Sequence, residues 1–189
     1  MSCMGNAHGL GNFEYGGHTV VDMANQKVFR GVAWSWTRRF SIGASGVYNI
    51  CIDPTGIDPG KTSIVLPTSF IAFGAGPINV DLYFGTAYSG GTAWPGANRD
   101  NRITTTPKTV VYGGAAVTTP GVKTPFEFMI PSDGVPATAS LGGQAKDDLI
   151  FIARNDGIYR WELTNTEANV ASCVFAMTLF EVTPGVNNG

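Results

Sequence analysis

The sequence predicts an all-β protein, a single antiparallel β-sandwich of jelly-roll type with an extended N-terminal arm. Glycine (25) and proline (11) together supply 36 of the 189 residues, too many for long helices. Apolar residues alternate with polar ones in short runs separated by turn residues, which is the period of half-buried strands. Hydrophobic residues make up 43% of the chain, enough for one full core. We expect an arm at residues 1–26, one sandwich domain at 27–184 and a tail at 185–189.

The arm is rich in glycine and carries few apolar anchors. Residues 1–17 contain five glycines, with Leu10, Phe13 and Tyr15 as candidate anchors. Such a segment has little to bury by itself, so we expect the anchors to dock it either on a neighbouring subunit or other partner, or on its own domain. Its first residues lack a basic region followed by an apolar one, so no signal peptide is predicted.

The first half of the domain contains four alternating or β-branched runs. Residues 53–60 hold two Asp-Pro pairs and two glycines, which predict a double turn. The run from 62 to 73 contains Pro67, which cannot donate to a ladder, so it is an edge strand or breaks into two strands. The expected strands are 32–40, 48–52, 62–73 and 78–84.

The second half begins with a Gly/Pro-rich stretch, residues 86–102, for which a long loop is predicted. Residues 144–148 could form one helical turn. The remaining extended segments are expected at 109–118, 126–130, 149–153, 159–166 and 170–182.

The last expected strand is apolar on both faces. Such a strand is either central and covered on both sides or in contact with another subunit. Because only one face of each sheet in a sandwich is core, we expect a homo-oligomer, with a trimer favoured and a dimer possible. A covering loop is the alternative. The face expected at the subunit interface carries Phe175, Met177 and Leu179.

Few residues could carry catalysis or bind a metal. The two histidines, His8 and His18, lie in the arm, away from the expected strands. No nucleophile elbow is present, and the three cysteines share no metal-ligand spacing. Asp53 and Asp58 would suit a loop calcium site or ordinary turn formation, and turn formation is favoured. We expect no enzyme activity, no cofactor and no bound metal.

Charge and hydropathy argue against two classes of partner. The formal net charge is −2, so we expect no nucleic-acid partner. No apolar run reaches the ~20 residues of a membrane span, so we expect no membrane partner. Arg30, Arg38 and Arg39 form a small basic cluster, which would either meet an acidic partner or form a solvated strand face, and the solvated face is favoured.

Trp94 is the one tryptophan placed in an expected loop, so we expect it to be exposed. An exposed tryptophan could anchor in a partner's pocket or stack on a glycan. It could also fold back over the end of the sandwich.

Two parts of the chain resemble a known family. The first is DLYFG at residues 81–85, followed by GGTAWPGANRDNR at 90–102. The second is YRWELTNT at 159–166, followed by a long apolar strand that ends in FEV at 180–182. In pattern and order, over residues 40–182, they resemble small β-sandwich proteins on the heads of tailed bacteriophages, the capsid decoration or cement proteins.

This resemblance implies a structural virion protein, made in the host cytoplasm, that binds the major capsid protein on the outside of the shell and bridges capsomers. The alternative is a head-fibre or tail-associated module that recognises a host-surface glycan through Trp94. The residues expected to contact the capsid or another partner are Leu10, Phe13, Tyr15, Trp94, Arg99 and Arg102.

Overall fold

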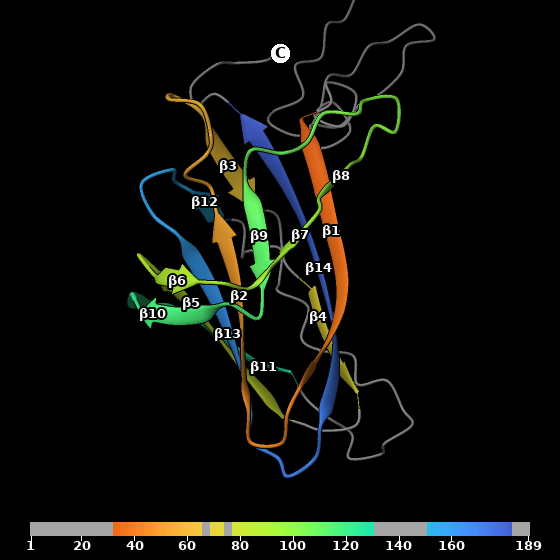
Figure 1. Ribbon diagram of the computed structural model, residues 1–189, viewed down its shortest axis with the longest axis vertical. Coiled ribbons are helices and arrows are strands. Elements are labelled where there is room, and N and C mark those ends of the chain that lie inside the picture. Colours follow the sequence, from red (N-terminus) through yellow and green to blue (C-terminus); the bar gives the residue numbers. More distant parts are fainter. Residues whose placement is uncertain (1–31, 66–68, 74–76, 131–150, 183–189) are drawn as a thin grey trace, which may run out of the picture.

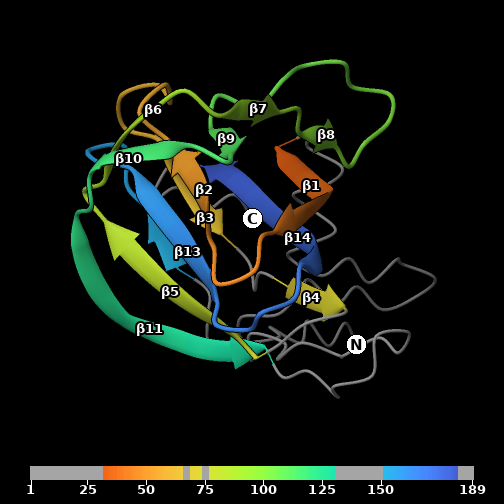
Figure 2. The same cartoon turned by 60° about the horizontal axis from the view of Figure 1, so that its bottom comes forward.

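The computed structural model describes residues 32–65, 69–73, 77–130 and 151–182. Within these ranges the chain is all-β, and its strand pairs are antiparallel. The strands form two six-stranded sheets and one two-stranded sheet, and Figure 2 shows the two large sheets as facing layers. The predicted antiparallel β-sandwich is therefore confirmed. The expected arm at 1–26 and tail at 185–189 lie outside the described residues.

The first large sheet, called the β14 sheet, is centred on the longest of the described strands (Figure 1). β14 pairs with β1 on one side and with both β3 and β4 on the other. The order is β12 (Phe151–Ala153), β3 (Thr62–Val65), β14 (Ala171–Val182), β1 (Ala33–Ile42) and β8 (Ala97–Asn98), with β4 (Ser69–Phe73) also beside β14.

The second large sheet, called the β13 sheet, faces the first (Figure 2). Its order is β11 (Val122–Ile130), β5 (Ile78–Phe84), β13 (Tyr159–Asn165), β2 (Val47–Asp53), β9 (Val110–Gly113) and β7 (Thr92–Trp94). A short ladder of β6 (Ala87–Ser89) and β10 (Ala116–Thr119) forms the two-stranded sheet.

The core lies between the two large sheets and is built by alternation along each strand. Side chains at every second position are removed from water, and burying each large one contributes about 1.5–3 kcal/mol. The largest fully buried apolar side chains are Trp36, Phe175, Ile42, Ile50, Ile52, Ile78, Leu82, Ile130, Leu163 and Leu179.

Two turns at one end of the sandwich carry the chain between the sheets and are bonded to each other. The β1–β2 turn contains Ser45, whose amide donates to the carbonyl of Glu167 in the β13–β14 turn at 2.8 Å. The amide of Asn165 donates back to the carbonyl of Gly46 at 2.9 Å. These bonds satisfy backbone groups that the ladders leave unpaired at the corners.

Most of the expected strands are confirmed within a few residues. The run from 62 to 73 breaks into β3 and β4, one of the two outcomes expected around Pro67, which itself lies outside the described residues. The prediction of a long loop at 86–102 is wrong, because this stretch forms β6, β7 and β8. The turn from β6 to β7 uses positive φ angles of 64° at Gly90 and 85° at Gly91, which glycine adopts without strain. The possible helical turn at 144–148 lies outside the described residues.

Candidate functional site

Trp94 is not an exposed anchor, and that expectation is wrong. Its side chain is 8% exposed, and its ring lies 5.6 Å from the ring of Phe175 in the core. Gly113 on the neighbouring β9 makes room for it, because a Cβ there would come within 2.0 Å of the Trp94 ring. The Trp94 carbonyl accepts a hydrogen bond of 3.0 Å from the indole of Trp36. Trp94 closes the side of the sandwich and cannot stack on a partner or a glycan.

The expected subunit interface on β14 is also wrong. Phe175, Met177 and Leu179 are 0%, 2% and 0% exposed within a single chain, so they belong to the core of the sandwich. β14 is the central strand of its sheet, which explains the length of its apolar pattern. The other expected contact residues in the arm, Leu10, Phe13 and Tyr15, lie outside the described residues.

Arg99 and Arg102 stand at the start of an exposed segment between β8 and β9, called the 99–108 loop. Figure 2 shows this loop projecting from the sandwich beyond β8. The side chains of Arg99, Arg102, Thr104, Thr105, Thr106 and Lys108 are all exposed. The loop holds three cationic side chains and one carboxylate, Asp100, so its formal charge is opposite in sign to the net −2 of the chain.

A chain of side-chain contacts orders the start of this loop. The Asn98 side-chain oxygen accepts from the amide of Asp100 at 2.8 Å. Asp100 is only 6% exposed and accepts from Arg102 through Nε at 2.9 Å, Nη2 at 2.7 Å and the backbone amide at 3.1 Å. These bonds lower the pKa of Asp100 to about 2. The Arg102 side chain remains 73% exposed, so it is oriented by Asp100 while facing solvent.

The end of the loop is attached to the β14 sheet. The amide of Thr109 donates to a carboxylate oxygen of Glu181 at 2.7 Å. The Thr109 hydroxyl lies 2.7 Å from that of Ser63 on β3, and both residues are buried. Because Thr109 directly precedes β9 of the opposite sheet, these contacts hold the loop where the two sheets meet.

The base of the loop packs on a core tryptophan. Gly96, between β7 and β8, is so close to Trp36 that a Cβ would come within 2.5 Å of its ring and 3.0 Å of Pro107. This close approach lets the chain cross from the β13 sheet to the β14 sheet over a short turn. The 99–108 loop is therefore fixed at its start, its end and its base.

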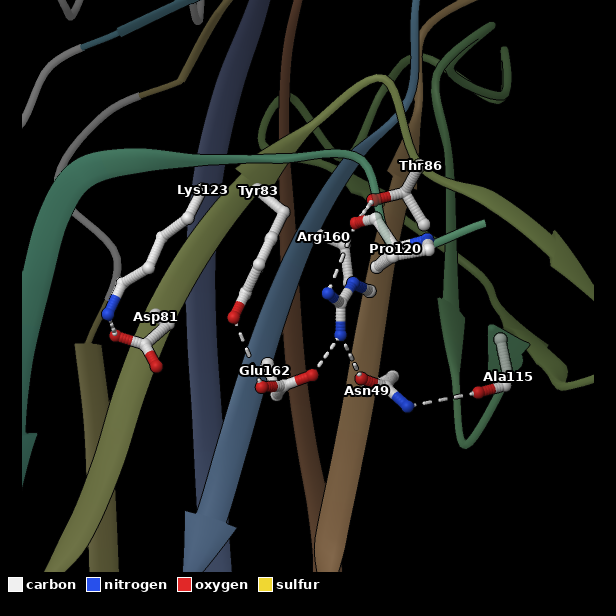
Figure 3. A network of polar contacts seen from close by, with 9 residues as sticks. All are labelled: Asn49, Asp81, Tyr83, Thr86, Ala115, Pro120, Lys123, Arg160 and Glu162. Atoms are coloured by element: carbon white, nitrogen blue, oxygen red, sulfur yellow. Dashed lines mark hydrogen bonds and ion pairs between the residues drawn. The ribbon is translucent and has the colours of Figure 1, made fainter. Parts of the chain in front are cut away.

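A buried network on the outer face of the β13 sheet was not anticipated from the sequence. Arg160 is 1% exposed and donates from Nη1 to Asn49 at 2.9 Å and to Glu162, and from Nη2 to the carbonyl of Pro120 at 3.2 Å (Figure 3). Its guanidinium lies 3.9 Å from the ring centroid of Tyr83. Both Nη atoms are engaged by the protein itself, so the network binds the β10–β11 turn to the sheet.

Other polar groups of the described residues are similarly used within the chain. Lys123 pairs with Asp81 at 2.9 Å and with Glu127 at 2.8 Å, and Tyr88 donates to Asp53 at 3.1 Å. Asp53 also accepts from the amide and hydroxyl of Thr55, which is the turn-forming role that the sequence favours. Within the described ranges, no group of three His, Cys, Asp or Glu side chains could hold a metal ion. These ranges also contain no helix with the length and hydropathy needed to span a membrane.

The 99–108 loop is the strongest candidate for a partner surface, because it is exposed, cationic and hydrogen-bonded at its start and at its end. Sequence reasoning identified Arg99 and Arg102 but missed Asp100 and Thr109, which order the loop. The alternation of Asn98, Asp100 and Arg102 could have indicated side-chain-to-backbone turns. No protein-family model matches the chain, and neither a curated protein nor a solved structure matches it.

Proposed function

We propose that this chain is a structural virion protein that binds the outside of a bacteriophage capsid and bridges capsomers. The sequence patterns at 81–102 and 159–182, which resemble those of decoration proteins, support the proposal. The observation that carries it is the 99–108 loop, an exposed cationic segment fixed to both sheets of a β-sandwich. The proposed partner is the major capsid protein, and the place of action is the virion surface.

A preordered loop suits a protein whose task is attachment. Ordering a flexible segment on binding costs conformational entropy, and a loop that is already held by Asp100 and Thr109 avoids much of that cost. A shell under outward load from packaged DNA gains from added contact area between capsomers. A decoration protein supplies that area without catalysis.

The positive charge of the 99–108 loop indicates the kind of capsid surface that it would bind. Arg99, Arg102 and Lys108 present cationic groups, of which Arg102 is partly neutralised by Asp100. The matching capsid surface would carry carboxylates, since complementary charges speed and orient association. A trimer or a dimer of this chain would match the symmetry axes of a shell. Its subunit interface would use residues other than those on the core face of β14. A jelly-roll connectivity of the sandwich remains part of this proposal.

The glycan-binding alternative has lost its main support. It depended on an exposed Trp94, and Trp94 is a core residue. We therefore retain only the capsid-binding function.

Binding to shells that lack the protein tests the proposal. Purified chain, the double variant Arg99→Glu/Lys108→Glu and the control variant Arg154→Glu would each be incubated with such shells and cosedimented. Arg154 is a suitable control, because it is 69% exposed and follows β12, at the opposite edge of the β14 sheet from β8. We expect saturable binding of the wild-type chain and the control, and about tenfold weaker binding of the loop variant.

The outcomes test capsid attachment separately from the role of the 99–108 loop. No binding of the wild-type chain would refute capsid attachment. Equal binding of all three proteins would support capsid attachment but show that the 99–108 loop is not the binding surface. Deleting residues 1–17, with Leu10, Phe13 and Tyr15, is expected to weaken docking while the sandwich stays folded, and undiminished binding would reject the role of the arm.

A further inference from the structure

Strand β1 has a long edge that no described residue pairs with. β8 lies beside only the upper end of β1 (Figure 1), where Trp34 pairs with Asn98 and Ser35 with Ala97. From Trp36 to Ile42, β1 pairs with β14 alone among the described residues. A strand edge of this kind is a ready template for one more strand.

Two backbone hydrogen bonds show which residues face that edge. The carbonyl of Val32 accepts from Glu181, just beyond the β14 end of the ladder, at 3.2 Å, whereas the carbonyl of Ala33 accepts from Arg99, on the β8 side, at 2.9 Å. The register with β14 continues without a shift from Ala33 to Ile42. Because backbone direction alternates along a strand, Thr37, Arg39 and Ser41 direct their amides and carbonyls to the open edge.

This edge lacks two of the devices, a proline and a bulge, that protect another edge strand in the same molecule. β11 contains Pro125 and a register shift between Lys123 and Glu127, and its Lys123 is engaged in two ion pairs. Such proline residues, bulges and charges block the addition of strands. The open part of β1 has no proline and no bulge.

Two arginines flank the open edge. Arg39 is exposed on the outer face, and its neighbour Arg38 is half-buried and points to the other face. Neither forms an ion pair with any described residue. An added strand would meet one cation on each of its faces.

We propose that the β1 edge from Thr37 to Ser41 accepts an extended acidic segment of a partner protein as an additional strand. Main-chain hydrogen bonds would give affinity, and carboxylates paired with Arg38 and Arg39 would give specificity. A second copy of this chain fits poorly, since antiparallel pairing of two β1 edges brings the arginines of both copies together. The inference does not rest on capsid attachment and holds for any partner with such a segment.

Amide exchange and a designed peptide test this inference on the full chain. The probe is an eight-residue peptide of threonine and valine with two adjacent glutamates at its centre. In the free chain, NMR should show fast exchange at Thr37, Arg39 and Ser41 and slow exchange at Arg38 and Phe40, which bond to β14. Adding the peptide should slow exchange at the first three amides.

Matched peptides separate strand addition from simple charge attraction. A peptide with two lysines in place of the glutamates removes the charge match. A glutamate peptide N-methylated at alternate residues keeps the charge but cannot form the ladder. Both should bind about tenfold more weakly than the probe. The variant Arg38→Glu/Arg39→Glu should prefer the lysine peptide, and Arg154→Glu should behave as wild type.

Several results would overturn the inference. One is equal binding of the N-methylated peptide, and another is no binding of the probe at millimolar concentration. A third is slow exchange at Thr37, Arg39 and Ser41 in the free chain. Slow exchange would mean that the edge is occupied by this chain or a second copy, and its dependence on concentration would tell these apart. Binding of neither peptide, with fast exchange, would mean that the arginines only guard the edge.

Discussion

The side-chain amide of Asn165 donates to the carbonyl of Gly43 at 3.0 Å and so joins the two turns that cross between the sheets. The same amide donates to the carbonyl of Asn169 at 2.8 Å, and its oxygen accepts from the amide of Glu167 at 3.0 Å. Asn165 is 1% exposed. It is the asparagine of the LTNT segment that contributes to the resemblance to decoration proteins, and its contacts within the chain are structural.

Replacing Asn165 by alanine should destabilise the protein by about 2–4 kcal/mol, because buried backbone groups lose their partners. Chemical denaturation of the variant would measure this loss. Asn169→Ala is the control, since the Asn169 side chain is exposed and its carbonyl is kept. Equal stability of Asn165→Ala and Asn169→Ala would contradict the role of Asn165.

Asp100 should make the 99–108 loop sensitive to acid. Its hydrogen bonds with Arg102 lower its pKa to about 2, below the ordinary value of about 3.9. A lowered pKa in the folded state adds stability that is fully present above the unfolded value and is lost as the pH falls toward 2. The free energy of unfolding, followed between about pH 5 and pH 2, should fall less steeply for Asp100→Asn than for wild type. Parallel curves would show that Asp100 does not contribute.

Lysine should not replace Arg160, although both are cations. A lysine ammonium carries its three donors on one nitrogen, whereas the guanidinium reaches Asn49 and Glu162 from Nη1 and the Pro120 carbonyl from Nη2. Lysine therefore does not reproduce this fixed spacing of donors. We expect Arg160→Lys to lower the free energy of unfolding by about 1–3 kcal/mol. Urea titration would measure it, with Lys61→Arg, at an exposed ion pair, as a substitution that should change little. An unchanged midpoint for Arg160→Lys would mean that the network is dispensable.

Gly96 should tolerate no side chain at the base of the loop. A Cβ at Gly96 would overlap the ring of Trp36, whereas a Cβ at Gly43 would meet nothing within 4 Å. Gly96→Ala should therefore destabilise the protein by about 1–3 kcal/mol, and Gly43→Ala should have little effect. Thermal unfolding of the two variants compares them directly. A similar melting temperature for both would show that Trp36 moves aside freely.

The strands could be predicted because their signal is local. Alternation such as that of residues 78–84 follows from one covered and one open face of a sheet, and it is visible in the sequence itself. The break around Pro67 was also predictable, because proline cannot donate to a ladder.

The errors concern contacts between distant residues. The glycines around Trp94 suggested a loop, but its burial depends on Gly113, a residue of another strand that leaves space for the ring. On β14, alternation separated two faces without showing which one is core, so Phe175 was placed at an interface. Arg160 occupies an outward position on β13, and its burial involves residues of other elements, the turn containing Pro120 and the ring of Tyr83 on β5.

The number of copies of this chain per purified particle tests the central claim most directly. Quantitative mass spectrometry would compare it with the major capsid protein of the same particles. Shell decoration predicts a copy number comparable to that of the capsid protein. A few copies per particle would instead indicate a vertex or tail component and would contradict shell decoration.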